Sequence, residues 1–414
     1  MTRRSGGLLL ASWHDPVLLA LALLATFLGA LAIVDAGYVR SLDKSQVLVP
    51  RELAMHGVGF LVGLLGYLWV SRRSAAGLQR FALLVWLGCF ILLALTKTPL
   101  GVEMNEARRW VRLGPIQVQP SEFAKVGALL YLSAVLAGRK PWHNRPIPLT
   151  PLPRWLDWVL VPKLARAAPF LWVVLAAGLI ELEPDLGTAA VLVSASYLLL
   201  IAGGVSRKSL LLLFAAGLLG ATLLATGKSY RMERLTSHWH RWEQANMDDV
   251  GYQTVQSEIG MALGGFVSLD AGGGRTKRMI PAPTTDFIMA TIAEETGFVG
   301  ATAVIGLLGA IVWRLLWLAR RAPTRFGGLV LTGLAGWIGV QSCVNVCMAN
   351  ALIMPIGVPL PFFSSGTSSL VALWVAMGLA QAAMRPVPQK ATVEVEHAAG
   401  RDRWGHGRAR LSRA

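Results

Sequence analysis

The stretch "RMIPAPTTDFIMATIAEETGFVG", residues 278–300, changes character at Asp286. The residues before Asp286 are polar and include two prolines, whereas those after it form a long apolar run that contains Glu294 and Glu295. An apolar run of this length predicts a helix at home in a lipid bilayer. Acidic residues in such a helix are costly and usually line a functional cavity. The stretch therefore predicts a transmembrane helix with a polar site near its start.

The rest of the chain has the composition of a polytopic membrane protein. Of its 414 residues, 54% are hydrophobic and only 15% are charged, and the mean hydropathy is +0.53. Apolar stretches of roughly 16 to 25 residues recur, each long enough to cross a hydrocarbon core of about 30 Å. We expect an all-α polytopic membrane protein with about ten transmembrane helices. The expected spans are 16–34, 53–70, 81–96, 122–138, 169–182, 188–203, 209–226, 286–318, 327–350 and 366–383.

The charged residues predict the orientation of these spans. The connections after spans two, four, six and eight are basic, and Asp157 is their single acidic residue. The long connection 227–285 has seven basic and six acidic residues, and 351–365 has no charge. Because basic loops stay in the cytoplasm, both termini are predicted to be cytoplasmic, with a large extracytoplasmic loop between helices 7 and 8. The net charge of +16 then marks cytoplasmic loops and does not require a nucleic-acid partner.

The chain is expected to form one transmembrane domain, 1–384, followed by a polar tail, 385–414, that is predicted to be cytoplasmic and disordered. The N-terminal apolar run from Pro16 to Val34 is longer than the apolar part of a typical signal peptide, so we expect a retained first span. No internal repeat is visible, which weighs against transporters built from duplicated halves.

Outer loop 97–121 contains a cationic patch and the start of a helix. The patch consists of Arg108, Arg109 and Arg112. Ser121 is predicted to cap the helix, and Glu122 and Lys125 share a helix face because they are three residues apart. Ionisable residues at the start of a span can simply extend toward water. An ion pair beside an arginine cluster instead favours a cradle for an anionic headgroup such as a diphosphate.

Two short outer turns add polar groups. The turn "LEPDLGT", 182–188, contains Asp185, which could cap the next helix and do nothing more. The segment 351–366 has three prolines and no charge, and ends with Ser364 and Ser365. Such a segment cannot expose its backbone to lipid. It is therefore predicted to be buried in protein or to line a wet cavity.

The long outer loop, 227–285, is predicted to form an amphipathic, Trp-rich interfacial helix followed by a glycine-rich passage, 264–274. No strand or Walker lysine accompanies these glycines, which excludes a nucleotide-binding loop. His238 and His240 lack companion acids at metal spacing. Three polar residues could hydrogen-bond a sugar, namely Tyr252, Gln253 and Ser257.

Asp286 is expected at the outer rim of the eighth span. On a continuous helix, Glu294 would lie about 12 Å deeper in the membrane than Asp286 and about 80° around the helix axis from it. Glu295 would point nearly opposite to Asp286. A simple helix cap is the alternative role for Asp286. With Glu294 below it and cationic loops beside it, we predict a functional carboxylate.

Together these motifs resemble those of the SEDS proteins (shape, elongation, division and sporulation), the RodA/FtsW-type glycosyltransferases that polymerise lipid II. The resemblance covers nearly all ten spans and rests on "ARRW" at 107–110, "QPSEFAK" at 119–125, "EPDLGT" at 183–188, "GYQTVQS" at 251–257, "TDFIMATIAEETGFVG" at 285–300 and "PIGVPLPFFSSGTSS" at 355–369. The chain departs from the family pattern at Glu106, Arg278, Ala282, Thr284, Ser365 and Thr367. Its polar tail and the "AEE" at 293–295 favour the FtsW branch.

The resemblance implies an inverting sugar transfer at the outer face of a bacterial cytoplasmic membrane. Asp286 would be the general base on the 4-hydroxyl of the acceptor, while Arg108, Arg109 and Lys125 would steady the leaving diphosphate. The other expected substrate-binding residues are Glu122, Asp185, Tyr252, Gln253, Ser257, Glu294, Ser364 and Ser365. A divalent cation, Mg²⁺ or Mn²⁺, could share the diphosphate. The family also implies a class B penicillin-binding transpeptidase as partner.

Two other functions fit parts of the sequence. A lipid II flippase would use Glu294 and Glu295 to relay protons, and a non-catalytic scaffold would only recruit the transpeptidase. The polar motifs gather at the outer rim and not at the midplane of two matching halves, which favours the polymerase. Replacement of Asp286 by asparagine separates the three: a scaffold tolerates it, a polymerase does not, and a flippase depends more on Glu294.

Overall fold

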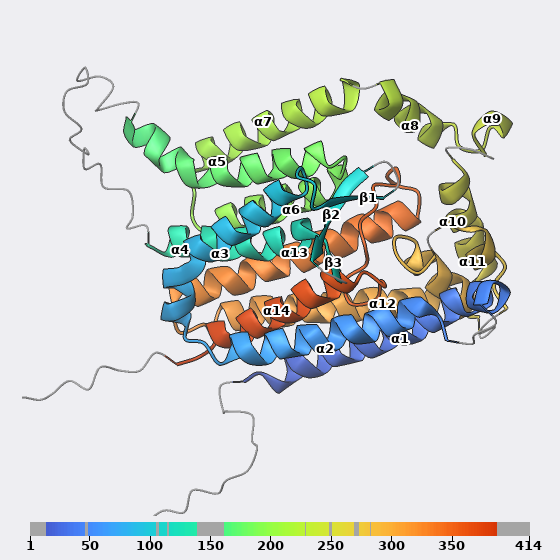
Figure 1. Ribbon diagram of the computed structural model, residues 1–414, viewed down its shortest axis with the longest axis horizontal. Helices are drawn as coiled ribbons and strands as arrows, with labels where there is room; N and C mark the ends of the chain where they lie inside the picture. Colours follow the sequence, from blue (N-terminus) through green and yellow to red (C-terminus); the bar gives the residue numbers. More distant parts are fainter. Residues whose placement is uncertain are drawn as a thin grey trace, which may run out of the picture.

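The computed structural model describes residues 14–45, 49–104, 107–113, 116–138, 161–227, 229–247, 251–268, 273–281 and 283–386. The fold is a helical bundle with a small sheet on one connection (Figure 1). Its elements are α1 (Pro16–Ser45), α2 (Arg51–Ser71), α3 (Ala75–Leu95), β1 (Gly101–Met104), β2 (Ala107–Leu113), β3 (Ile116–Val118), α4 (Pro120–Gly138), α5 (Val161–Leu182), α6 (Leu186–Ala202), α7 (Arg207–Thr226), α8 (Ser229–Trp239), α9 (Gln244–Met247), α10 (Tyr252–Leu263), α11 (Thr276–Met279), α12 (Ile288–Ala319), α13 (Arg325–Ala349) and α14 (Thr367–Ala383).

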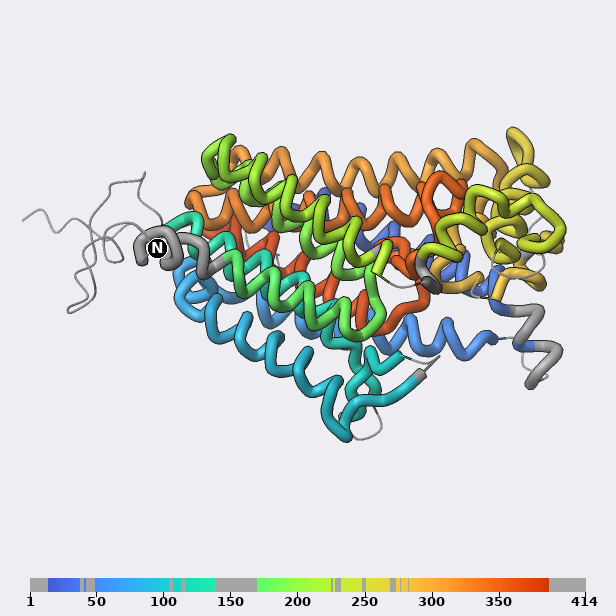
Figure 2. Tube along the Cα trace, turned by 90° about the horizontal axis from the view of Figure 1, so that it is seen from above, coloured from blue at the N-terminus to red at the C-terminus, as the bar shows by residue number. Residues whose placement is uncertain are grey.

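The predicted membrane-spanning segments coincide with helices of this bundle. Within the described residues, seven helices are long and apolar enough to cross a bilayer, and three shorter apolar helices cover the remaining predicted spans. The shorter ones are Phe170–Leu182, Leu186–Ala202 and Thr367–Ala383. The polytopic helical fold is therefore confirmed, while the count of ten spans and the orientation of the termini stay predictions. Figure 2 shows the long helices running side by side, with α8 to α11 gathered at one end.

Helices α4, α13 and α14 form the centre of the bundle. Most of α4 and α14 is buried, and the indole rings of Trp337 on α13 and Trp374 on α14 are fully enclosed. Small residues allow α2 and α14 to approach closely: a Cβ added to Gly378 would lie 2.8 Å from the carbonyl oxygen of Tyr67. Helix α7, in contrast, exposes large apolar side chains along its length, as a lipid-facing helix at the edge of the bundle does (Figure 1).

The connection between α3 and α4 forms a three-stranded antiparallel sheet, so the prediction of an all-α chain is wrong at this place. Strand β2 lies in the middle, and β1 carries an irregularity between Val102 and Glu103. Because side chains alternate along a strand, Arg109 shares its face with the buried Val111, while Arg108 and Arg112 are on the exposed face. The predicted patch of three arginines is therefore divided between two faces.

Helix α12 is broken at Gly297, which corrects the prediction of one continuous helix over 286–318. Gly297 has φ 70° and ψ −169°, a backbone conformation open mainly to glycine. The amides that follow the break bond to another segment: Phe298 N donates to Gly265 O at 2.9 Å and Val299 N to Phe266 O at 3.1 Å. Glu294 and Glu295 thus lie on a short N-terminal segment of α12, and the part of α12 beyond Gly297 is long enough to cross the membrane.

The large loop between α7 and α12 contains the predicted amphipathic helix, α8, and then α9, α10 and α11. Residues 269–272 of the glycine-rich passage and the tail from 387 onward lie outside the described residues. The proline-broken segment 351–366 forms no regular helix and is largely buried, with Val358, Leu360 and Phe362 each 1% exposed. This agrees with the prediction that it is enclosed in protein.

Candidate active site

Asp286 lies on a loop that is held in place by its backbone. Asn345 on α13 donates through Nδ2 to the carbonyl oxygen of Asp286 at 2.9 Å and to that of Val358 at 2.7 Å. Ser364 Oγ donates to the carbonyl oxygen of Thr285 at 2.6 Å, and Ser365 N donates to that of Thr284 at 2.9 Å. The loop 283–287 is therefore fixed to segment 351–366 while the carboxylate of Asp286 makes none of these bonds.

The two serines predicted to bind substrate thus have another role here. The hydroxyl of Ser364 also accepts from Leu360 N at 2.8 Å, so both its donor and an acceptor position are used within the protein. The hydroxyl of Ser365 lies 3.3 Å from Thr284 Oγ1. Through these contacts Ser364 and Ser365 hold the loop that carries the carboxylate of Asp286, and their binding of substrate stays a prediction.

The carboxylate of Asp286 is half-buried beside segment 351–366. Gly357, which has φ 69°, lies next to this carboxylate. A Cβ added to Gly357 would lie 3.6 Å from Asp286 Oδ2, so the lack of a side chain leaves space beside this oxygen. Burial raises the pKa of Asp286 to about 6, the negative charge of Asp185 adds to the rise, and the positive charge of Arg109 opposes it. A carboxyl group with a pKa of about 6 can act as a general base near neutral pH.

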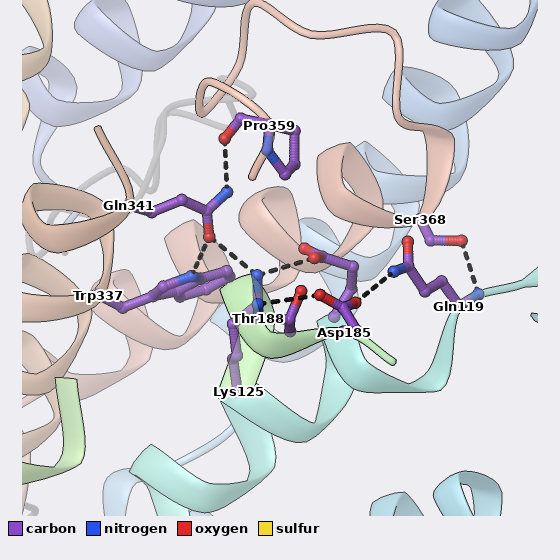
Figure 3. Close-up of polar contacts among 9 residues, drawn as sticks. Gln119, Lys125, Asp185, Thr188, Trp337, Gln341, Pro359 and Ser368 are labelled. Carbon is purple, nitrogen blue, oxygen red and sulfur yellow. Dashed lines mark hydrogen bonds and ion pairs between the residues drawn. The ribbon is translucent and has the colours of Figure 1, made fainter. Parts of the chain in front are cut away.

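Asp185, the second acid, is buried at the N-terminus of α6. Its Oδ1 accepts from Thr188 N at 3.0 Å, which confirms the predicted helix cap, and Gln119 Nε2 lies 3.5 Å from its Oδ2 (Figure 3). Gln119 N in turn donates to Ser368 Oγ at 3.0 Å. Burial raises the pKa of Asp185, with Arg109 and the Thr188 hydrogen bonds opposing and Glu122 adding to the rise. Asp185 is therefore both a cap and an electrostatic neighbour of Asp286.

Glu122 and Lys125 form the predicted ion pair, at 2.8 Å, with both side chains almost fully buried. Lys125 Nζ also donates to Gln341 Oε1 at 2.8 Å and lies over the ring of Trp337. Gln341 continues the network, because its Nε2 donates to Pro359 O at 2.9 Å (Figure 3). The ammonium group of Lys125 is buried between α4 and α13 and is bonded to Glu122 and Gln341, so its contact with a diphosphate stays a prediction. The pair links α4 to the segment in front of Asp286.

Arg109 is a cation whose charge acts on both Asp185 and Asp286. Its Nε donates to Glu183 O at 3.0 Å and its Nη2 to Pro184 O, which aligns it with the turn that precedes Asp185. Glu183 is itself buried and accepts from Thr96 Oγ1 at 2.6 Å. Burial raises the pKa of Glu183 to about 7, against the effect of Thr96, Lys97 and Arg109. Arg108, by contrast, forms an exposed pair with Glu103 at 3.1 Å.

Several other predicted site residues lie apart from this cluster. Ser257 Oγ donates to Ala349 O at 2.7 Å and is buried, so it ties α10 to α13. Tyr252 and Gln253 are half-buried at the start of α10. Glu294 accepts from Arg275 N at 2.8 Å and thus contacts the chain before α11. Ser121 lies inside the first turn of α4, and its buried hydroxyl has no hydrogen-bond partner among the described residues, so the predicted cap is wrong.

The donor groups of the described residues do not by themselves make a metal site. Nowhere in the described parts of the chain do three His, Cys, Asp or Glu side chains form a group that could hold one. The carboxylates near Asp286 are also partly engaged, since Asp185 caps α6 and Glu122 holds Lys125. The divalent cation therefore stays a prediction.

Sequence reasoning missed Gln119, Gln341, Asn345 and Ser368, which connect the cluster. The signal for two of them was present, because Gln341 and Asn345 are polar, lie four residues apart in an apolar span, and are both fully buried. Polar residues inside a membrane helix usually face protein and mark a site.

The chain resembles known proteins over most of its length. The model of the cell cycle protein family of FtsW, RodA and SpoVE matches residues 15–386. Stage V sporulation protein E of Bacillus subtilis is 29% identical over 371 residues, which is 88% of this chain and 95% of that protein. The probable peptidoglycan glycosyltransferase FtsW of Nitrosococcus halophilus is 35% identical over 362 residues, covering 84% of this chain and 89% of the relative.

The fold has a solved counterpart. One chain of a peptidoglycan synthase complex, described as coordinating polymerization and crosslinking, superposes with a TM-score of 0.71 at 32% identity and covers 91% of this chain and 98% of its own. A family model that spans nearly the whole chain, close relatives and a shared fold point to one conclusion. This chain belongs to the cell cycle protein family of FtsW, RodA and SpoVE.

Proposed function

We propose that this protein is a peptidoglycan glycosyltransferase that polymerises lipid II into glycan strands at the outer face of a bacterial cytoplasmic membrane. The observation that carries the proposal is the half-buried carboxylate of Asp286, whose pKa of about 6 is set by burial, Asp185 and Arg109. Relatives that are named peptidoglycan glycosyltransferases support it. The bundle of apolar helices suits a substrate that is anchored in the membrane by its lipid.

The proposed reaction is an inverting displacement. Asp286 accepts the proton of the acceptor's 4-hydroxyl while that oxygen forms a bond to the anomeric carbon of the donor MurNAc. The bond from this carbon to the diphosphate oxygen breaks on the opposite side, and the lipid diphosphate leaves with the electron pair. Because Asn345, Ser364 and Ser365 fix the backbone of the Asp286 loop, the base is held in position before the acceptor arrives.

The leaving diphosphate is assigned to arginines of the sheet. The charge of Arg109 acts on Asp286, and at this place it would stabilise the negative charge that develops on the leaving diphosphate. Arg108 is exposed and forms only a weak surface pair with Glu103, so a diphosphate can replace that partner. Lys125 and Glu122 are buried inside the bundle. They position segment 351–366 through Gln341, which bonds to Lys125 and to Pro359 O.

Family membership also supports a class B penicillin-binding transpeptidase as partner, since a solved relative belongs to a complex that couples polymerization with crosslinking. The flippase alternative is less well supported. Glu294 and Glu295, its proposed proton carriers, accept hydrogen bonds from the amides of Arg275 and Gly274. These bonds use both acids as acceptors for the backbone before α11, which supports a structural role for them over proton relay.

The direct test is incubation of the purified protein with lipid II, with and without a cognate class B transpeptidase, and separation of the glycan products by length. We expect polymer, and more of it with the partner. Translocation of lipid II in liposomes without polymer would instead establish the flippase, and absence of both activities would favour the scaffold.

Two substitutions should move the pH profile in opposite directions. A general base works in its ionised form, so kcat/KM falls as the pH drops below the pKa of Asp286 in the free enzyme, about 6. Asp185→Asn removes a charge that raises this pKa, and the acidic limb should move to lower pH. Arg109→Gln removes a charge that lowers it, and the limb should move to higher pH.

The measurement is kcat/KM for lipid II between about pH 4 and about pH 8, which is about two pH units either side of the expected midpoint. Arg108→Gln is the matched control, because Arg108 is not among the charges that set the pKa of Asp286; its midpoint should equal that of wild type even if its rate is lower. Shifts of the same sign in Asp185→Asn and Arg109→Gln would show that the limb does not report Asp286.

A further inference from the structure

A second charged cluster lies next to the Asp286 loop and has no part in the reaction described above. Lys277 on α11 is 1% exposed, and its Nζ lies 2.6 Å from Glu295 Oε1 and 3.0 Å from Asp35 Oδ1. Burial alone would lower the pKa of Lys277, but its hydrogen bonds and charge interactions with Glu295 and Asp35 outweigh burial, and the pKa is raised. The ammonium group is thus held charged between α1 and α12, and we name these three side chains the lysine clasp.

The backbone around Lys277 reinforces the clasp. Gly274 N donates to Glu295 Oε1 at 3.0 Å and Arg275 N to Glu294 Oε1 at 2.8 Å. A Cβ added to Gly274 would lie 2.5 Å from Glu295 Oε1, so the close approach depends on glycine at this position. Two adjacent acids in an otherwise apolar run therefore serve one purpose, which is to bind the chain that enters α11.

The clasp and the Asp286 loop share a small core of their own. Ile280, Phe287 and Ala290 are buried against one another and against Met261 of α10, separate from the main core of the bundle. Ile280 follows directly on α11, and Phe287 follows directly on Asp286. Thr284 lies against α1, where a Cβ on Gly37 would be 3.6 Å from its methyl group. The loop that carries Asp286 is therefore held on its N-terminal side by the lysine clasp and on its other side by Asn345 and Ser364.

We propose that Lys277 is a positioning residue for Asp286: by joining α1, α11 and the N-terminal segment of α12, it fixes the N-terminal side of the loop that presents the carboxylate. This inference rests on the proposed function, because its main readout is the polymerisation rate. Asn345 and Ser364 fix only one side of the loop. Both sides must be fixed if the carboxylate of Asp286 is to keep its position relative to the acceptor hydroxyl in the transition state.

The test compares Lys277→Met and Lys277→Arg with Arg278→Met, an exposed neighbour on the same helix that is outside the clasp. For Lys277→Met we expect kcat for lipid II polymerisation to fall at least about 10-fold while KM changes less than about 2-fold, since misplacement of a catalytic group lowers the rate of the chemical step. Lys277→Arg keeps a cation between the two acids and should recover much of kcat. Arg278→Met should match wild type.

Hydrogen exchange of the amides in 283–290 provides a readout that does not depend on activity. Exchange there should be faster in Lys277→Met than in Arg278→Met. If Lys277→Met does not fold, Glu295→Gln replaces it, because glutamine keeps an acceptor for Gly274 N and removes only the charge. Equal kcat and equal exchange in Lys277→Met and Arg278→Met would overturn the inference, as would a change in KM alone. A wild-type protein that makes no polymer would contradict the proposed function, while the exchange comparison would still test the clasp.

Discussion

Asp286→Asn is expected to lower lipid II polymerisation by about 10²- to 10⁴-fold, the usual contribution of a general base. Asparagine has nearly the same shape as aspartate and cannot accept the proton of the acceptor hydroxyl. The fold should be unaffected, because the bond from Asn345 and the bonds to Thr284 and Thr285 all use backbone atoms of the loop. The measurement is the initial rate of glycan formation by purified wild type and variant.

The matched control is Glu243→Gln, which neutralises an exposed acid in the connection between α7 and α12 that pairs with His240. Its rate should equal that of wild type. Equal rates for wild type and Asp286→Asn, with the variant folded, would remove Asp286 from the mechanism. In that case a comparison of lipid II translocation by the same two proteins would decide between a flippase and a scaffold.

Lys125→Met should have the largest effect on stability, a loss of about 3–5 kcal/mol in the free energy of unfolding, because it leaves the carboxylate of Glu122 buried without its cation. Methionine fills much of the same volume, so packing against Trp337 is largely kept. The measurement is the free energy of unfolding of the detergent-solubilised protein, monitored by the fluorescence of its tryptophans.

Two controls separate the ion pair from other effects. The double variant Glu122→Leu/Lys125→Met removes both charges and should regain most of the lost stability, since apolar replacement of a whole buried pair is often close to neutral. Arg108→Met breaks the exposed pair with Glu103 and should cost no more than about 1 kcal/mol. A double variant as unstable as Lys125→Met would mean that the lysine stabilises the fold through Gln341 and not through Glu122.

Much of the fold was predictable because membrane helices are encoded locally, in the length of apolar runs and in the charges between them. The sheet at 101–118 was not, because its strands are short and their pairing depends on contacts between separate segments. The break in α12 was hidden for another reason. Glycine is common in membrane helices, so Gly297 gives no local sign that it adopts a positive φ.

The candidate site was predictable in part. The predictions for Asp286 and Asp185 follow from their positions as acids at the ends of apolar spans. In the structure, the charges of Asp185 and Arg109 both act on Asp286. The functions of the hydroxyl residues could not be read from the sequence, because Ser257 and Ser364 bond to carbonyl groups that are 92 and 79 residues away along the chain. The enclosure of Lys125 was equally non-local, since it depends on Gln341 of another helix.

The interruption at Gly297 also determines where this chain can vary in length. In an unbroken helix, one inserted residue rotates everything beyond it by about 100°, and such a twist would carry Glu295 away from Lys277. Because the amides of Phe298 and Val299 are held by Gly265 and Phe266, the helical phase of the N-terminal segment of α12 is set independently of the membrane-crossing part. Insertions near the C-terminal end of α12 should therefore leave the carboxylate of Asp286 in place, whereas one between Lys277 and Gly297 should not.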